Sequence, residues 1–310
     1  MTRYLIGAGG WAYFYVPGLK SLEAYSRLFN FVEVNSTFYT LPKLRMVESW
    51  RNRVPPDFEF SVRLNRAVTH KFKLEPSKEA FEIFNYTRQI CNILRAEIIV
   101  MQTPESAEFN EGKIKSIKDF FRSLNLKGLR IAWEIRRKSR VPEALLTFMQ
   151  DQNIIHCVDI SKEEPFYESD QLYTRLFGKG KDNIYQFTDD ELKEIDRRIR
   201  SRDYDQVRIS FHNVRMYKDA ARLKIFRETG KFPPITRYLG LESLKKVLAE
   251  DAKFPATKEE LIEKQGWKVI DLTSKKRVHS RDLLLKLPER KYQNLNEVIR
   301  ALTRLKIHFE

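Results

Sequence analysis

The chain has 310 residues, of which 42% are hydrophobic and 32% are charged. This composition supports a packed core, and no stretch approaches the roughly 20 consecutive apolar residues needed to cross a bilayer, so we do not expect a membrane-spanning protein. The first residues lack the layout of a signal peptide, and two cysteines, Cys91 and Cys157, are too few for a disulfide framework or a thiolate zinc site. We therefore expect a cytoplasmic globular protein.

The charge balance, 57 Lys and Arg against 42 Asp and Glu, gives a formal net charge of +15 and allows two interpretations. A strongly basic surface attracts nucleic acid through counterion release, whatever the fold. Alternatively, proteins from hot environments are enriched in Lys, Arg and Glu and use few cysteines. We favour the first interpretation, with DNA ahead of RNA as the expected partner.

Short apolar runs alternate with longer helical patterns over residues 1–252, which predicts an α/β domain with a parallel sheet. Eight such runs favour a TIM-like (β/α) barrel over an open doubly wound sheet, and no G-x-G-x-x-G or Walker sequence follows any of them. The predicted strands are Tyr4–Ala8, Phe31–Ser36, Phe58–Leu64, Glu97–Gln102, Arg130–Ile135, Ile155–Ile160, Leu172–Leu176 and Val207–Phe211. The predicted helices include Ser77–Leu94, Gly112–Leu124, Pro142–Gln150 and Asp189–Ser201.

A small α+β appendage is predicted over residues 253–310. Thr257 and Glu260 form a capping box that starts a helix, and the segments Trp267–Asp271 and Arg277–His279 form a hairpin, before a helical pattern over Asn294–Leu305. This unit has 14 Lys and Arg against 8 Asp and Glu. The basic helix–hairpin–helix module is either an accessory for nucleic-acid or partner binding or a clamp packed on the barrel, and the sequence leaves both open.

Charged and polar side chains alternate with apolar ones on five of the predicted barrel strands. Alternate residues of a barrel strand point inward, and the carboxyl ends of the strands build the site. Buried charges must pair or face a wet site, so an internal ion-pair network is the structural alternative to a catalytic centre. The alternation predicts these inward groups: Glu33, Asn35, Thr37, Ser61, Arg63, Asn65, Glu134, Arg136, Tyr173, Arg175, Arg208, Ser210 and His212.

Candidate roles follow from position and chemistry. His70 lies on the loop after the third strand and Asp159 lies near the end of the sixth, so they join Glu33 and Glu134 as candidate catalytic residues. One divalent cation, Mg²⁺ or Mn²⁺, is a possible cofactor, although no H-x-x-x-H spacing and no serine or cysteine nucleophile motif is present. We expect arginine side chains to hold a phosphate and aromatic rings to stack on a base or a sugar. The predicted substrate-binding residues are Trp11, Tyr13, Asn35, Arg63, Arg136, Arg175, His212 and Asn213.

Several motifs lie on these same segments: Gly7-Ala-Gly-Gly-Trp11-Ala-Tyr13, Val32-Glu-Val-Asn-Ser-Thr-Phe-Tyr39, Leu41-Pro42, Pro55-Pro-Asp-Phe58, Thr69-His70 and Val207-Arg-Ile-Ser-Phe-His-Asn213. Over roughly residues 4–225 they resemble the YecE-like family, a TIM-barrel domain of unknown function. The chain departs from the family pattern at Phe177-Gly178 and His212-Asn213, and its extra C-terminal module resembles a small archaeal-type module of unknown role. The resemblance implies a barrel whose pocket holds Glu33, Asn35, Arg63, His70, Glu134 and Asp159.

These features together predict a nucleic-acid-processing enzyme, namely a DNA-acting hydrolase of the endonuclease or damaged-nucleotide type. The outline of the family's barrel is similar to that of the apurinic-endonuclease type, but the zinc ligands of that group are missing from this sequence. An enzyme acting on a sugar or sugar phosphate is the first alternative, because such barrels commonly hold phosphate near the last two strands. A non-catalytic nucleic-acid-binding protein is the second.

Overall fold

The computed structural model describes residues 2–16, 18–136, 141–180, 183–233, 238–273 and 276–305. Within these residues, one sheet of eight parallel strands has the order β6-β5-β4-β3-β2-β1-β8-β7. A parallel bridge between Val158 and Thr174 joins the two ends of this order, so the sheet is nearly closed and the predicted TIM-like barrel is confirmed. The barrel strands are β1 (Arg3–Ala8), β2 (Phe31–Val34), β3 (Glu59–Arg63), β4 (Ile98–Thr103), β5 (Arg130–Ile135), β6 (Ile155–His156), β7 (Gln171–Leu176) and β8 (Gln206–Phe211).

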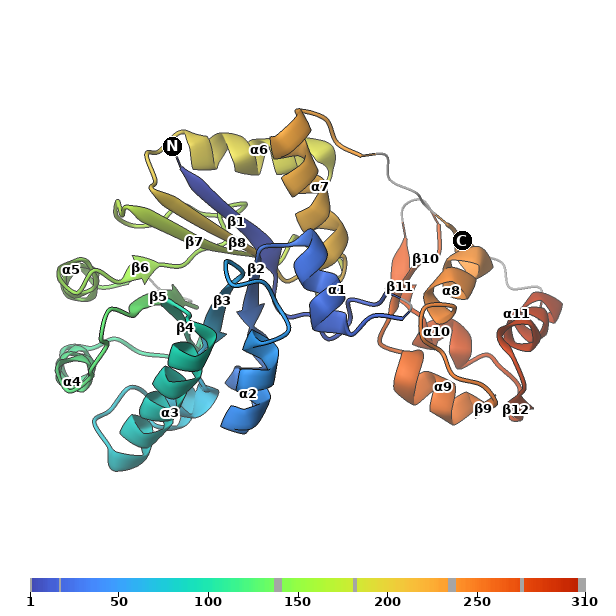
Figure 1. Cartoon of the computed structure of the whole chain (residues 1–310), viewed down its shortest axis with the longest axis horizontal. Coiled ribbons are helices and arrows are strands. Elements are labelled where there is room, and N and C mark those ends of the chain that lie inside the picture. Colours follow the sequence, from blue (N-terminus) through green and yellow to red (C-terminus); the bar gives the residue numbers. More distant parts are fainter. Residues whose placement is uncertain are drawn as a thin grey trace.

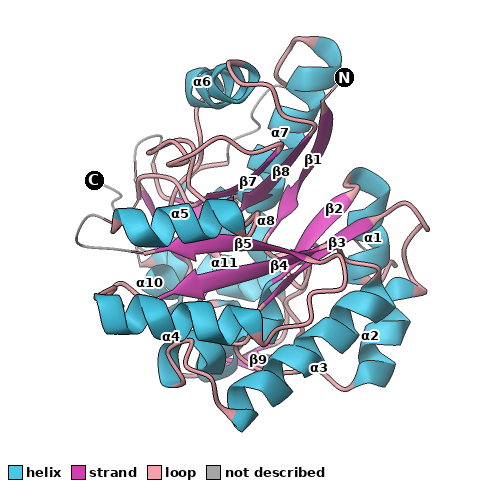
Figure 2. Cartoon of the chain, turned by 90° about the vertical axis from the view of Figure 1, so that its left-hand side faces the viewer, coloured by secondary structure: helices cyan, strands magenta, loops and turns pink. Residues whose placement is uncertain are grey.

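Helices cover the outside of the barrel, as Figures 1 and 2 show. The outward side chains of the strands, such as Val32, Phe60 and Trp133, are buried with apolar helix residues in one large core. None of the described helices is long and apolar enough to cross a membrane. The helices of this domain are α1 (Ser21–Leu28), α2 (Leu44–Arg51), α3 (Lys78–Leu94), α4 (Glu111–Arg122), α5 (Glu143–Asp151), α6 (Asp189–Arg200) and α7 (Met216–Thr229).

Two of the predicted strands end at least two residues earlier than expected. The second strand ends at Val34, because Asn35–Phe38 turns into a 3₁₀ helix, η1. The Thr37 hydroxyl lies 2.8 Å from the carbonyl oxygen of Val34 and 2.6 Å from that of Arg63, so this side chain leaves the inward face on which alternation placed it. The sixth strand is reduced to Ile155–His156, with only the bridge at Val158 beyond it.

The chain after the barrel folds into a second unit with its own core (Figure 1). Its first helix, α8 (Gly240–Leu248), contributes Leu244, Val247 and Leu248 to that core. The boundary expected between residues 252 and 253 therefore falls inside this unit, because the apolar face of α8 packs here and not on the barrel. The remaining elements are β9 (Ala256–Thr257), α9 (Lys258–Gln265), β10 (Val269–Asp271), β11 (Arg277–His279), α10 (Arg281–Leu284), β12 (Lys291–Tyr292) and α11 (Leu295–Arg304).

The second unit contacts the rim of the barrel through its β10–β11 hairpin. Arg215, which follows β8, donates a hydrogen bond to Asp271 at 3.0 Å. Arg277 donates to the same carboxylate at 2.6 Å and to the Gln186 side chain of the barrel at 2.7 Å. These contacts are polar and join two separate apolar cores, so the hairpin docks beside the carboxyl end of β8 without merging the two units.

Candidate active site

The barrel interior is built in layers along its axis. At the amino ends of the strands, Arg208 lies 3.1 Å from both Glu59 and Glu97 and donates to the Gln171 side chain at 2.8 Å. Above this ion-pair cluster lies a small apolar core that includes Leu5, Phe31, Val100, Ala132 and Tyr173. The polar groups nearest the carboxyl ends form the third layer. Arg208 therefore belongs to an internal ion-pair network and not to a catalytic centre, and the candidate site is confined to the third layer.

The centre of the third layer is an ion pair between Glu33 of β2 and Arg175 of β7. The Arg175 guanidinium donates its Nη2 to Glu33 Oε1 at 3.0 Å and its Nε to Oε2 at 3.1 Å. The Tyr173 hydroxyl donates to Glu33 Oε2 at 2.9 Å. Both residues of the pair are almost completely inaccessible to solvent. Burial opposes ionisation, but Arg175 and His212 hold the pKa of Glu33 well below its usual range, so this carboxylate stays charged.

Glu134 of β5 bridges two arginines. Its Oε2 accepts from Arg175 Nη1, and its Oε1 accepts from Arg136 Nε at 2.7 Å. Burial raises and the two guanidinium groups lower the pKa of Glu134, with a net shift below its ordinary value. A carboxylate with a lowered pKa is a weak proton acceptor at neutral pH. Glu33 and Glu134 are therefore better suited to positioning the arginines than to acting as general bases.

His212, which directly follows β8, completes the cluster. Its Nε2 lies 3.0 Å from Ser210 Oγ, 3.3 Å from Arg175 Nε and 3.4 Å from Glu33 Oε2. Burial and Arg175 lower the pKa of this imidazole, so the ring is neutral at neutral pH. A Cβ added at Gly9 would lie only 2.3 Å from His212 Cε1, so the close approach of the ring requires glycine at that position.

Arg63 of β3 differs from Arg175 because its direct partners are neutral. Its guanidinium donates to the side-chain oxygens of Asn35 and Gln102 and lies 3.6 Å from the centroid of the Phe38 ring. The Nε atom is buried and has no hydrogen-bond partner, although the residue is only 5% exposed. Burial and the neighbouring charge of Arg175 lower the pKa of Arg63 to about 10, which leaves it protonated at neutral pH.

A cavity of about 720 Å³ opens at this end of the barrel and is lined by Gln102, Glu134, Arg136 and His70, among others. His70 lies on the π-helical turn η2 (Ala67–Lys71), and its Nδ1 is 2.8 Å from Thr69 Oγ1. Burial and Arg63 lower the pKa of His70. The cavity therefore presents a neutral imidazole and the Arg136 side chain on its lining.

Asp159 also lines the cavity, but its carboxylate is occupied by the surrounding loops. Its Oδ1 accepts from the Ser161 backbone at 3.1 Å, and its Oδ2 accepts from the Phe177 backbone at 3.1 Å. Lys162 Nζ lies 3.2 Å from Oδ2. The geometry gives Asp159 the role of holding two loops at the mouth.

Three other predicted site residues lie outside the cluster. Trp11 packs with Trp50, at 5.1 Å between ring centroids, behind the barrel wall and not in the mouth. Tyr13 is 60% exposed and contacts the second unit. The Asn213 amide donates to the carbonyl of Tyr185 at 2.8 Å and to Asp219, and so supports the loop after β8.

Gln102 is a site residue that the sequence analysis missed. It accepts from Arg63 and lies 3.5 Å from Arg175 Nη1, so it links the two buried arginines. Ile98, Val100 and Gln102 alternate on one face of β4, which indicates an inward side chain at Gln102, but a neutral amide does not stand out in a pattern of charged groups.

A single divalent cation in the barrel mouth would need a set of acidic or histidine ligands. No group of three or more His, Cys, Asp and Glu side chains within the described residues is arranged to hold a metal ion. The predicted single Mg²⁺ or Mn²⁺ therefore has no ligand set among the described residues.

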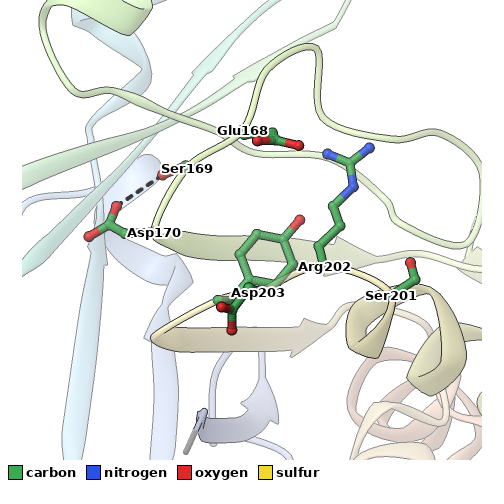
Figure 3. Close-up of a pocket in the computed structure, with 7 residues that line it drawn as sticks. Glu168, Ser169, Asp170, Ser201, Arg202 and Asp203 are labelled. Atoms are coloured by element: carbon green, nitrogen blue, oxygen red, sulfur yellow. Dashed lines mark hydrogen bonds between the residues drawn. The ribbon is translucent and has the colours of Figure 1, made fainter.

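A further cavity of about 500 Å³ lies at the opposite end of the barrel, between the segments that precede β7 and β8 (Figure 3). It is lined by Glu168, Asp170, Arg202 and Asp203, and none of the inward groups of the third layer reaches it.

Fold and site define a TIM-like barrel protein with a buried glutamate–arginine cluster at the carboxyl ends of its strands. The family described as "Protein of unknown function DUF72" matches residues 5–228, and the chain belongs to this family. The UPF0759 protein YecE of Escherichia coli K12 is 42% identical over 57 residues, which cover 18% of this chain. The match spans 21% of the length of that relative.

Solved structures of the same family share the fold. A DUF72 family protein of Thermotoga maritima MSB8 superposes with a TM-score of 0.58 and 24% identity, covering 73% of this chain and 99% of that one. A DUF72 family protein of Enterococcus faecalis V583 gives a TM-score of 0.57 and 15% identity, covering 74% and 98%. At these identities the likeness shows the fold alone.

Proposed function

We propose that this protein is a nucleic-acid-processing hydrolase whose barrel mouth binds a phosphate of the strand. The observation that carries the proposal is Arg63, a buried cation whose direct partners are the neutral oxygens of Asn35 and Gln102 and whose Nε has no partner. A buried charge is costly unless an opposite charge accompanies it. An anionic ligand at the mouth supplies that charge.

Arg136 is suited to share this anion. Its side chain is 46% exposed at the rim, and Glu134 holds it in place by the 2.7 Å contact. Arg175, by contrast, has each of its three guanidinium nitrogens engaged, with Glu33, Glu134, Gln102 and His212. The phosphate clamp is therefore assigned to Arg63 and Arg136, with Arg175 as the bridge that positions the two carboxylates.

His70 is the proposed proton acceptor for the attacking water. Its neutral imidazole lines the same cavity as Arg136, and a neutral histidine accepts a proton more readily than an arginine-paired carboxylate. The water oxygen forms a bond to phosphorus as its proton passes to His70. The ester P–O bond breaks, and the leaving oxygen takes a proton from solvent in the open cavity. The arginines offset the charge that develops on the phosphoryl oxygens.

The choice of nucleic acid over another phosphate ester rests on charge. The net charge of +15 creates a field that favours a polyanion. Two basic residues lie at the turn that carries His70: Arg66 directly precedes this turn, and Lys71 is its last residue. A sugar phosphate remains the second candidate, because a cavity of about 720 Å³ suits a small molecule. Its binding would depend weakly on salt, whereas binding of a strand falls steeply.

The test compares Arg63→Met with Arg197→Met. Both changes remove one positive charge, but Arg197 lies on α6 with its side chain 70% exposed and pairs with Glu194 of the same helix. We expect Arg63→Met to weaken binding of a labelled oligonucleotide at least tenfold and to slow its cleavage, and Arg197→Met to change neither by more than about twofold. Equal behaviour of the two variants, in anisotropy and in a gel cleavage assay, would remove the basis of the proposal.

A further inference from the structure

Two exposed aromatic rings meet where the second unit approaches the barrel. Tyr13, on the loop after β1, and Trp267, just before β10, have ring centroids 4.0 Å apart at an interplanar angle of 38°. Tyr13 is 60% exposed and Trp267 is 43% exposed. Large aromatic surface left in water is unfavourable unless a ligand covers it, so the pair is a candidate binding surface.

The pair lines a cavity of about 370 Å³ whose walls come from both units. From the barrel, Asn35 and His212 reach this cavity, and Asn35 is the residue that accepts from Arg63. The cavity therefore leads from the aromatic pair to the edge of the polar cluster. Its basic lining includes Lys218, whose side-chain ammonium makes no hydrogen bond or ion pair with a described residue, and Arg215, whose Nε is buried without a partner.

We propose that this cleft is a base-stacking subsite, in which one unpaired nucleobase of a bound strand stacks on Trp267 and Tyr13 while an adjacent phosphate meets Lys218. The inference rests on the proposed function, because it assumes that a nucleic-acid strand enters the barrel mouth. It goes further by assigning the substrate as single-stranded or locally unpaired at this point. Stacking on aromatic rings needs a free base face, which a base inside a duplex lacks.

Trp267 allows a direct optical test with the full-length protein. Of the four tryptophans, Trp267 is the most exposed, at 43%. The probes are a thymidine oligonucleotide of about eight nucleotides and an abasic strand of the same length and charge, since single-strand sites span about 4–16 nucleotides. The variants are Trp267→Ala, the conservative Trp267→Phe and the control Tyr238→Ala. Tyr238 is 41% exposed but does not line the cavity.

We expect the thymidine strand to quench tryptophan emission and to bind about tenfold more tightly than the abasic strand. Trp267→Ala should remove both the quenching and the preference, Trp267→Phe should keep the preference, and Tyr238→Ala should behave like the wild type. Thermal unfolding of each variant shows whether the second unit is intact. If folded Trp267→Ala binds the two strands as the wild type does, the subsite is refuted.

Two other outcomes separate this inference from the proposed function. Equal affinity of the wild type for the thymidine and abasic strands refutes stacking, even where the protein cleaves nucleic acid. A wild type that prefers the thymidine strand but cleaves neither supports the subsite and counts against the hydrolase. A duplex that binds as tightly as the single strand, with the same quenching, also overturns the assignment of an unpaired base.

Discussion

Replacing Glu33 with glutamine should destabilise the barrel strongly. Glu33 is inaccessible to solvent and accepts two hydrogen bonds from Arg175, so the amide would leave a buried guanidinium without its main counter-charge. Breaking a buried ion pair in this way costs ~3–5 kcal/mol. For a domain of this size that corresponds to a fall of roughly 10 °C in Tm. Adding Arg175→Met to Glu33→Gln should recover part of the loss, because it removes the orphaned charge.

Glu134→Gln provides the matched comparison. Here Arg175 keeps both oxygens of Glu33, and Arg136 is 46% exposed, so neither arginine is left buried and unpaired. We expect a loss below ~2 kcal/mol and a Tm within a few degrees of the wild type. Hydrolysis should nevertheless fall at least tenfold, because Arg136 would no longer be held at the mouth.

Calorimetry or circular dichroism gives Tm, and cleavage is measured per folded molecule for each variant. If Glu33→Gln melts within about 2 °C of the wild type, the ion pair between Glu33 and Arg175 does not stabilise the fold and the prediction is wrong. A large fall in Tm for Glu134→Gln, with activity per folded molecule unchanged, would assign Glu134 to the scaffold. The search for catalytic groups would then return to His70 and Asp159.

Four further predictions concern other parts of the structure. Gly9→Ala should displace the His212 ring and lower Tm. Gly112→Ala is the control and should leave Tm unchanged, because its added Cβ would lie 3.6 Å from Asn110 Oδ1, an ordinary van der Waals contact. Equal melting temperatures of the two variants would contradict this prediction. The pKa of His212 is lower in the folded state than its unfolded value of about 6.5, so the folded protein is destabilised as pH falls from that value towards the folded pKa. His212→Asn should therefore make the free energy of unfolding less dependent on pH in this range. An unchanged pH profile of the free energy of unfolding would contradict this prediction. A chain ending at residue 233 should melt cooperatively, whereas one ending at 252 should aggregate because it exposes the apolar face of α8; light scattering decides between them. Oligonucleotide affinity should fall steeply in a salt titration, and a slope near zero would exclude a strand as the ligand.

Strand alternation predicted most of the site because the pleat of a strand is local. A side-chain period of two places Glu33, Arg63, Glu134 and Arg175 on inward faces whatever the rest of the chain does. Which of them pair is a different matter. Glu33 and Arg175 are 142 residues apart and meet only because the barrel closes with a particular stagger, which no local pattern encodes. The sequence therefore predicted the ionic layer without identifying Arg175 as its common partner.

The misplaced residues lie where no periodicity operates. Trp11 is on a loop, and an aromatic side chain there fits the helix layer as well as a binding surface. Thr37 left the inward face because its hydroxyl reached two backbone carbonyls and favoured a 3₁₀ turn over a further strand residue. The helix α8 has an apolar face that would suit either core, and only the three-dimensional packing assigns it to the second unit.

The family match and the second unit divide the site into two parts. The match ends at residue 228, before α8 begins, and the Thermotoga maritima relative is covered to 99% by 73% of this chain. Arg63 and the buried cluster therefore lie within the part of this chain that the family model matches. Trp267 lies beyond the match, and its contact with Tyr13 places an added wall beside a mouth that the barrel already possesses. Under the proposed function, this wall changes what the barrel selects, from a phosphate group alone to a phosphate group with an aromatic ring next to it.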